Sequence, residues 1–413
     1  MALRVTRSGK RELPDRWAYA LAGSVIGLGL FASATPSPLY RSYSLLFHFS
    51  PLTLTLIYAT YAFGVLASLL LLGGASDDVG RRPVLLVSLG ALMGSTVLFM
   101  LADSTAWLFV ARGVQGLATG AAVSAASASL LDFHPRRDPA GVGLTNATAS
   151  AAGLGLGTLV SSVIVALGTA PRVLPYAVLL GLFAIAFAGA YLMPEPVTER
   201  KAFSLTLERP SLPKAVHRPF VLAGLAVLSS WSIGALFFSL GPELADELFS
   251  TTNAVASGAG IVALAGSAVV AQLLTVRFPP WIGAAAGSLA LAAGILVIVG
   301  SAATGSGALF VAGSILGGAG FGAAFLGGLR ALVVAIPAGH RASVMSAFYI
   351  VAYASLSIPA VLAGLVATHL GLEKTFELFG VVVAVLAFAV AFEATRTRPR
   401  AAAQPALSPA RSS

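Results

Sequence analysis

The 413-residue chain has no cysteine and few charged side chains. The absence of cysteine excludes disulfides, thiolate zinc sites and a nucleophilic cysteine. Charged residues account for 10% of the chain, whereas a soluble globular domain carries about 25%. Apolar residues account for 57%, and the mean hydropathy is +0.90. This balance argues against a water-soluble enzyme and favours a protein embedded largely in lipid.

Motifs for enzymatic or cofactor chemistry are also missing. The sequence contains no Walker loop for ATP, no metal-ligand spacing and no nucleophile motif. Its 5 histidines all fall in loops or at the ends of apolar runs. We therefore expect neither an enzyme nor a bound cofactor or metal.

Long apolar runs fill most of the chain. Each is close to or longer than the roughly 20 residues that cross a bilayer, and none alternates apolar with polar residues as a barrel strand would. The sequence therefore predicts an all-α membrane protein with twelve transmembrane helices in two six-helix bundles. The runs are 17–38, 52–73, 83–102, 107–131, 140–167 and 173–193 in the first half, and 220–240, 251–276, 281–301, 308–334, 343–369 and 376–392 in the second.

Polar segments divide the chain into domains. Residues 194–219 are rich in proline and charge, which predicts a cytoplasmic linker between a first bundle at 17–193 and a second at 220–393. Residues 1–16 are expected to form a cytoplasmic tail. The Ala-, Pro-, Arg- and Ser-rich residues 394–413 are expected to form a disordered one.

The basic residues predict the orientation. With a cytoplasmic N-terminus, 21 of the 25 Lys and Arg residues face the cytoplasm, and only Arg41, Arg172 and Lys374 face outward. Both termini are therefore expected in the cytoplasm, with the chain crossing the cytoplasmic membrane many times. The net charge of +9 then reports topology rather than nucleic-acid binding. Residues 32–34 resemble a signal-peptidase site, but cleavage there would leave eleven crossings, so we expect the first helix to be retained.

The two halves share a glycine-rich segment. Residues 116–122 (GLATGAA) match residues 318–324 (GAGFGAA) at a constant offset of 202, in the fourth run of each half. Chance composition is the alternative, but the equivalent placement favours duplication. Parallel six-helix repeats imply alternating access around a central site.

The loop after the second run carries the most specific motif. Residues 73–85 read GGASDDVGRRPVL, which resembles the loop signature G-x-x-x-D-x-x-G-R-[KR]-x-x-L of the major facilitator superfamily. The resemblance implies a conformational latch formed by Gly73, Asp77, Gly80, Arg81 and Arg82, with Asp77 near the start of the eleventh helix, around 339–343. A basic loop that only fixes topology is the alternative. The equivalent loop at 276–280 lacks the acid and the glycines, so any latch is asymmetric.

A second motif places a charge inside the fourth run. Arg112 and Gln115 belong to a segment, RGVQGLATG, that is similar to the R-x-x-Q-G-x-x-x-G pattern of proton-coupled members. The resemblance implies a role in proton coupling or in binding a charged group of the substrate. Because a charge in hydrocarbon is costly, Arg112 should be paired with carbonyls, Gln115, Asn146 or an anionic substrate group, or it should snorkel to water near the helix end.

Polar and aromatic side chains within the runs are candidates for the substrate site. Such a lining suits a small, moderately lipophilic molecule, although each residue alone is better explained as interhelical or lipid-facing packing. Tyr349 and Tyr353 share one helix face because they are four residues apart. The full candidate set is Tyr58, Tyr61, Asn146, Trp231, Phe321, Phe325, Tyr349 and Tyr353.

Acidic residues are absent from the centres of the runs. Proton-coupled transport usually needs a titratable group that gains and loses water, which leaves Asp77, Asp132 or the surroundings of Arg112 as alternatives, or no coupling. Glu243, Asp246 and Glu247 follow Gly-Pro at 241–242 and are expected in a solvated loop that could draw cations to the outer mouth.

The leading hypothesis is a secondary transporter that exports a small amphipathic molecule by proton exchange, working as a monomer in contact with lipid. The fifth run is rich in glycine but lacks the Gly-Pro element that resemblance to exporters would require, which weakens export. Uptake or facilitated diffusion of a nutrient, and a transport-inactive sensor on the same scaffold, are the alternatives.

Overall fold

The computed structural model describes residues 4–5, 11–168, 170–199, 201–202, 212–251, 253–337 and 340–397. Almost all of these residues are helical. The elements are β1 (Arg4–Val5), β2 (Arg11–Glu12), α1 (Asp15–Ala34), η1 (Ser37–Leu39), α2 (Tyr40–Phe47), α3 (Pro51–Leu72), α4 (Ala75–Asp78), α5 (Arg81–Met100), α6 (Thr105–Phe133), α7 (Pro139–Ala166), α8 (Leu174–Tyr191), η2 (Lys214–Val216), α9 (His217–Ser239), α10 (Gly241–Phe249), α11 (Ala254–Thr275), α12 (Pro280–Thr304), α13 (Gly307–Ala335) and α14 (Arg341–Arg396).

The membrane crossings agree with the apolar runs. Within the described residues, 11 helical segments are long and apolar enough to span a bilayer. The last of them, α14, has 56 residues and is broken at Gly371, where φ is 83° and ψ is 170°. A straight helix of that length would measure about 84 Å, far more than a bilayer needs. The break at Gly371 divides α14 into two crossings and restores the expected twelve.

The ends of the predicted domains differ slightly from the structure. Before α1, strands β1 and β2 form a small antiparallel pair that the sequence did not predict. The backbone N–H of Leu13 donates to the carbonyl of Leu192 at 2.9 Å, which ties this end to the end of α8. At the linker, α9 begins at His217 rather than at residue 220. Pro219 is tolerated there because the first turn of a helix leaves its N–H groups unpaired.

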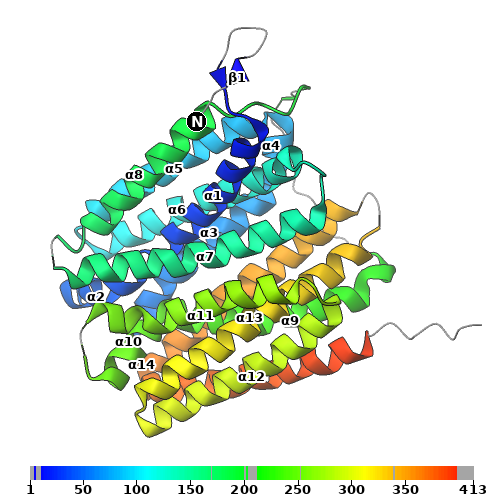
Figure 1. Cartoon of the computed structure of the whole chain (residues 1–413). Helices are drawn as coiled ribbons and strands as arrows, with labels where there is room; N and C mark the ends of the chain where they lie inside the picture. The colour runs from blue at the N-terminus through cyan, green and yellow to red at the C-terminus, as the bar shows by residue number, and fades with distance from the viewer. Residues whose placement is uncertain are drawn as a thin grey trace, which may run out of the picture.

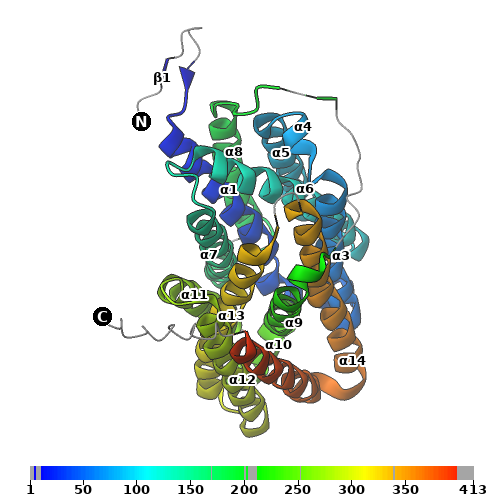
Figure 2. The same cartoon turned by 90° about the vertical axis from the view of Figure 1, so that its right-hand side faces the viewer.

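The six crossing helices of each half lie together. Figure 1 shows α1 to α8 above α9 to α14, with α2 and α10 at the same end of the molecule, which we call the α2–α10 end. We call the opposite end the linker end. The halves meet where α3 packs on α14 and α7 packs on α11, as the view in Figure 2 also shows. We call this meeting surface the seam.

Glycines set the same close helix contact in both halves. In α6, an added Cβ on Gly120 would lie 2.8 Å from the carbonyl oxygen of Val65 in α3. In α13, an added Cβ on Gly322 would lie 2.8 Å from Cα of Ala268 in α11. These glycines are the equivalent residues of the repeated segment, and their partner helices follow the first crossing of each half. The repeat in the sequence is therefore a repeat in packing, and small residues allow this close approach in membranes.

Candidate functional site

The loop signature at the linker end is organised by a carboxylate that lies far along the chain. Glu195 follows α8, and its carboxylate accepts hydrogen bonds from the backbone N–H groups of Arg81 and Arg82, each at 3.0 Å. These are the first two residues of α5, so Glu195 satisfies open donors at the helix N-terminus, where negative charge is also favoured. Gly80 makes this approach possible. Its φ is +108°, and a Cβ there would lie 2.6 Å from Oε2 of Glu195.

Arg81 links the signature to the end of α6. Its Nε donates to Oδ2 of Asp132 at 3.0 Å, and its Nη1 donates to Oγ of Ser76 at 2.8 Å. The same guanidinium forms an ion pair with Asp77. The Arg81 side chain is 11% exposed, whereas that of Asp77 is 67% exposed. Arg81 is therefore the buried centre of this network and Asp77 its exposed edge.

The remaining latch candidates lie around that network. The carbonyl of Gly73 accepts a hydrogen bond from Oγ of Ser124 in α6 at 3.2 Å. The guanidinium of Arg82 lies 4.9 Å from the ring centre of Tyr191. The structure thus gathers all five predicted latch residues at the linker end. The expected neighbour of Asp77 at the start of the eleventh helix includes Gly339, which lies outside the described residues.

Arg112 is fully buried and does not snorkel to water. Its Nε donates to the hydroxyl of Tyr40 at 2.9 Å, and its Nη1 donates to the carbonyl of Ser33 at 3.0 Å and to Oε1 of Gln115 at 2.6 Å. The guanidinium also lies 5.5 Å from the ring centre of Tyr61. Neutral acceptors and aromatic faces therefore hold the charge, as expected for an arginine in a dry interior.

The segment between α1 and α2 supplies these acceptors. The helix α1 ends at Ala34, just before the prolines at 36 and 38, and Tyr40 begins α2. The end of α1 leaves carbonyls without helical partners. Arg112 takes that of Ser33, and Nε2 of Gln115 donates to that of Ala32 at 3.1 Å. Asn146 is engaged elsewhere, since its amide nitrogen donates to Oγ of Ser127 at 2.6 Å.

Aromatic candidates from three helices of the second half form one cluster. The Trp231 ring centre lies 5.2 Å from that of Tyr353 and 5.8 Å from that of Phe325. Phe348 extends the cluster, with its ring centre 6.5 Å from Phe325 and 5.9 Å from Tyr349. The helices α9, α13 and α14 therefore converge on one aromatic group, and we call these five residues the aromatic cluster. Phe321 lies nearby on α13, against Gly234 of α9.

Two of the predicted substrate residues, both tyrosines, lie in the first half at the seam. Tyr58 and Tyr61 of α3 are both buried. Tyr58 also belongs to an apolar cluster that contains Ala360 and Ala363 of α14. Arg112 therefore lies beside Tyr61 in the first half, and Tyr58, three residues earlier on α3, packs with α14 of the second half. Phe321 packs against the same apolar cluster as Tyr58, whereas Asn146 is bonded to Ser127.

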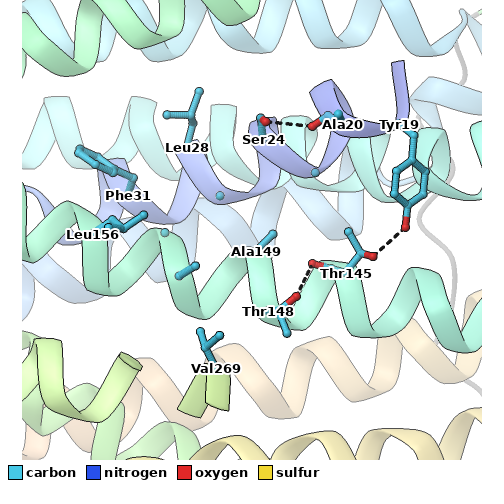
Figure 3. Close-up of a pocket in the computed structure, with 14 residues that line it drawn as sticks. Tyr19, Ala20, Ser24, Leu28, Phe31, Thr145, Thr148, Ala149, Leu156 and Val269 are labelled. Carbon is cyan, nitrogen blue, oxygen red and sulfur yellow. Dashed lines mark hydrogen bonds between the residues drawn. The ribbon is translucent and has the colours of Figure 1, made fainter. Parts of the chain in front are cut away.

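A pocket of about 530 Å³ lies elsewhere, between α1 and α7. Figure 3 shows Tyr19 at one end of it, with its hydroxyl directed at Thr145, and Val269 of α11 beside it. Small residues such as Gly27 and Ala149 line its middle. None of the predicted substrate residues lines this pocket.

At the α2–α10 end, side chains join the two halves directly. Arg41 of α2 forms an ion pair with Asp246 of α10, and Oγ of Ser37 donates to the carbonyl of Phe238 at 3.1 Å. Glu243, Asp246 and Glu247 were expected in a solvated loop, but they lie in the helix α10. The α10 helix forms because Pro242 occupies its first turn and apolar residues at 244, 245, 248 and 249 give it an inner face.

Sequence reasoning missed three of these functional contacts. Glu195 falls within the predicted linker, Tyr40 was not among the candidates, and Arg41 was noted only as one of the few outward basic residues. The prolines at 36 and 38 indicate a break at the end of the first helix, but not that its carbonyls meet Arg112. The sequence holds no signal for the partner of Glu195, because the contact joins residues 114 apart.

Comparisons with known proteins agree with this geometry. The fold and the buried site define a multi-pass membrane transporter built from two related helical halves. The family model described as Major Facilitator Superfamily matches residues 18–309, more than half of the chain. The chain belongs to the major facilitator superfamily. It is similar in structure to the human organic anion transporter MFSD10 (TETRAN), with a TM-score of 0.65 and 16% identity, covering 92% of this chain and all of that one. A search of curated protein sequences found no match.

Proposed function

We propose that this protein is a secondary transporter that moves a small amphipathic molecule by alternating access and exports it in exchange for protons. We also propose that the linker end faces the cytoplasm and that the membrane is the cytoplasmic one. The observation that carries the proposal is that the buried Tyr58 of the first half packs in one apolar cluster with α14 of the second half, with Phe321 of α13 against the same cluster.

The position of this group suits alternating access. Tyr58 and Tyr61 belong to the first half and Tyr353 to the second. A rocking motion of the halves would therefore open the space between these residues to one side of the membrane and then to the other. Tyr353 packs on Trp231, which in turn packs on Phe325. Aromatic faces bind apolar parts of a ligand and phenol hydroxyls bind polar parts, which together select an amphipathic molecule.

Arg112 has a supporting rather than a direct role in this proposal. Its guanidinium donates to Tyr40, Ser33 and Gln115, and it lies over the face of Tyr61. It therefore positions Tyr61 and holds a positive potential beside the tyrosines. We infer that transport is coupled to proton exchange through the positive potential of Arg112 beside these tyrosines. The alternative role of Arg112, as a direct partner of an anionic substrate group, would require it to give up protein acceptors.

Uptake or facilitated diffusion of a nutrient is the second candidate. It is favoured by the sequence of the fifth run, which lacks the Gly-Pro element that resemblance to exporters would require. A sensor that transports nothing is the third. The three candidates differ in their response to a pH gradient, because an exchanger follows the gradient, a facilitator ignores it and a sensor gives no flux.

The test begins with a thermal-shift screen of the purified protein against small amphipathic compounds. Stabilising compounds are then measured for flux in proteoliposomes with and without an imposed pH gradient. We expect flux against the concentration gradient when protons flow the opposite way. Trp231→Ala should weaken binding at least tenfold, while Phe388→Ala, which removes a 51% exposed ring from α14, should leave binding unchanged. Equal binding by both variants would contradict the assigned site.

A further inference from the structure

The pocket between α1 and α7 opens to the outside of the helical bundle. Ala152 and Leu156 of α7 line it. Leu154 lies between them in the sequence and packs against the apolar cluster that contains Tyr58 at the seam. With about 3.6 residues per turn, positions two apart on a helix point in nearly opposite directions. Leu154 therefore faces the interior between the halves and the pocket faces outward, on the side of α7 that Figure 1 shows at the front.

The pocket lies at membrane depth. Both α1 and α7 belong to segments that are long and apolar enough to span a bilayer. Figure 3 shows Tyr19 and Phe31 of α1 at its two ends. This stretch is about 18 Å long, close to half of the roughly 30 Å hydrocarbon core. Trp17, at the first turn of α1, is 42% exposed, as is typical of a tryptophan at the membrane–water boundary. The pocket therefore spans the leaflet at the linker end, and we call it the α1–α7 groove.

Small residues keep this groove open. The two helices touch at Gly27 and Gly153, where an added Cβ on Gly153 would lie 2.1 Å from the carbonyl oxygen of Gly27. No side chain fills the floor at these glycines, and the walls are the apolar side chains of Leu28, Leu156 and Val269. An elongated apolar groove of about 530 Å³ that faces lipid has the lining and size to hold an acyl chain.

The linker end of the groove is polar. The hydroxyl of Thr145 donates within its own helix, so the hydroxyl of Tyr19 donates to Oγ1 of Thr145 at 2.7 Å. The Tyr19 ring also packs edge-on against the ring of His134, with 5.6 Å between the ring centres. Nδ1 of His134 accepts from the backbone N–H groups of Arg136 and Asp138, each at 3.2 Å. These contacts fix the loop between α6 and α7 at the end of the groove.

Arginines surround this polar end. Arg16 lies in the first turn of α1, Arg136 and Arg137 lie in the loop, and all three are exposed. Within the part of the chain that the structure describes, no ion pair joins them to an acid. The acids at this end are Asp15 and Asp138, and Asp138 accepts from a backbone N–H in the first turn of α7. Three bases and two acids leave an excess of one positive charge, which is complementary to a phosphodiester.

We propose that the α1–α7 groove binds an anionic phospholipid of the linker-end leaflet. One acyl chain lies in the groove, and the phosphate lies at its polar end beside Tyr19 and the three arginines. Arginine and phosphate form charge-assisted hydrogen bonds, and each basic residue near an anionic headgroup strengthens binding. The site goes beyond the proposed transport function, because none of the candidate substrate residues lines the groove. Binding requires neither a substrate nor a pH gradient.

Native mass spectrometry of the full chain, released from detergent micelles, tests the proposal by counting bound lipids. The protein is titrated with phosphatidylglycerol and, separately, with phosphatidylcholine of the same chain length, which has no net charge. We expect one phosphatidylglycerol molecule to bind about fivefold more tightly than phosphatidylcholine, or better, since one basic residue near an anionic headgroup has an effect of this size. Equal binding of the two lipids would overturn the proposal.

A variant that fills the groove tests where the lipid chain lies. Ala20 is an exposed residue of α1 that lines the groove, and Ala188 is an exposed residue of α8 outside it, also near the linker end. Ala20→Phe should abolish the preference for phosphatidylglycerol, whereas Ala188→Phe should bind both lipids as wild type does. Circular dichroism and thermal unfolding in detergent check that both variants fold. Wild-type preference in folded Ala20→Phe would overturn the proposal.

Arginine variants test the other end without altering a packed interior. Arg16→Gln and Arg136→Gln should each weaken phosphatidylglycerol binding by about fivefold and leave phosphatidylcholine binding unchanged. Arg218→Gln, at an exposed position of α9 at the linker end, should change neither. Equal weakening by Arg218→Gln would reduce the preference to general surface charge and overturn the site. Loss of a dimer instead of a lipid in Ala20→Phe would also overturn it, by making the groove an interface between two copies.

Discussion

The two halves of the molecule share a helical plan but carry different chemistry. The first half holds the fully buried Arg112, which is bound to Tyr40, and the pair of Arg81 with Asp132. The second half holds the aromatic cluster around Trp231. At the position equivalent to Arg112, 202 residues on, the second half has Ser314, which donates to the carbonyl of Phe310 at 2.6 Å in its own helix.

The comparison separates features that both halves need for helix packing from features that only one half has. The glycines at 120 and 322 keep the same close helix contact in both halves. The loop signature, by contrast, has no counterpart in the second half, where Arg330 donates to the carbonyl of Phe278 at 3.1 Å. Helix packing is therefore common to the halves, whereas the network around Arg81 belongs to the first half and the aromatic cluster to the second.

The largest expected effect comes from breaking the shared packing. Gly120→Val and Gly322→Val should each lower the free energy of unfolding by 3 kcal/mol or more, roughly the upper range for overpacking, because the new side chains meet backbone that cannot yield. Thermal unfolding in detergent measures this loss. The controls are Gly90→Val and Gly300→Val, one in each half, where an added Cβ meets nothing within 4 Å. If the controls lose as much stability as the test variants, the repeat does not act through packing.

A smaller effect should separate the equivalent positions of the halves. Arg112→Leu leaves the Tyr40 hydroxyl, the Ser33 carbonyl and the Gln115 amide without their donor, which should cost about 1–3 kcal/mol. Ser314→Ala should cost well under 1 kcal/mol, since its hydroxyl bonds only within its own turn. Thermal unfolding compares the two variants. Equal losses of stability in the two variants would show that Arg112 contributes no more to folding than Ser314 does.

The cap on α5 should have an effect of about 1 kcal/mol, the usual value for a helix N-terminal cap. Glu195→Gln removes the charge that faces two backbone N–H groups, and the loss should appear in thermal unfolding and in faster hydrogen exchange at Arg81 and Arg82. Glu199→Gln, an exposed acid in the same linker, is the matched control. An unchanged hydrogen-exchange rate in Glu195→Gln would show that Glu195 does not cap the N-terminus of α5.

The smallest effect on stability is expected for Asp77. Its exposed ion pair with Arg81 is worth about 0.2–1 kcal/mol, so Asp77→Asn should fold and express normally. If the latch hypothesis is right, the same variant should nevertheless slow transport severely, which proteoliposome flux would measure. Asp78→Asn, at the neighbouring half-buried position, is the control. Wild-type flux in Asp77→Asn would reduce the signature to a topology signal.

The fold could be predicted from the sequence further than the site could. The apolar runs predict the crossings because each must match the thickness of a bilayer, and the separation at Gly371 follows from a polar gap between two runs. The contacts of Glu195 and Tyr40 could not be predicted, because each joins segments that only the packed bundle brings together. The α2 and α10 helices were also missed, since eight or nine residues are too few for a clear periodic signal.

The partners of Arg112 also show what the sequence can and cannot predict. Its burial cost indicates that a partner must exist, and Gln115 lies on the same face three residues on. The sequence alone leaves open whether the partner is a carbonyl, an amide or a substrate. The turn that places Ser33 and Tyr40 beside the guanidinium decides the matter.

The central claim, that the halves must separate at the α2–α10 end for transport, has a direct test in a disulfide across the seam. A Cβ on Gly258 of α11 would lie 3.4 Å from Cβ of Ser162 in α7, close to the separation of about 3.8 Å in disulfides. In a Ser162→Cys, Gly258→Cys variant, we expect oxidation to abolish flux of a compound found in the screen and reduction to restore it. Undiminished flux through fully cross-linked protein would contradict the account.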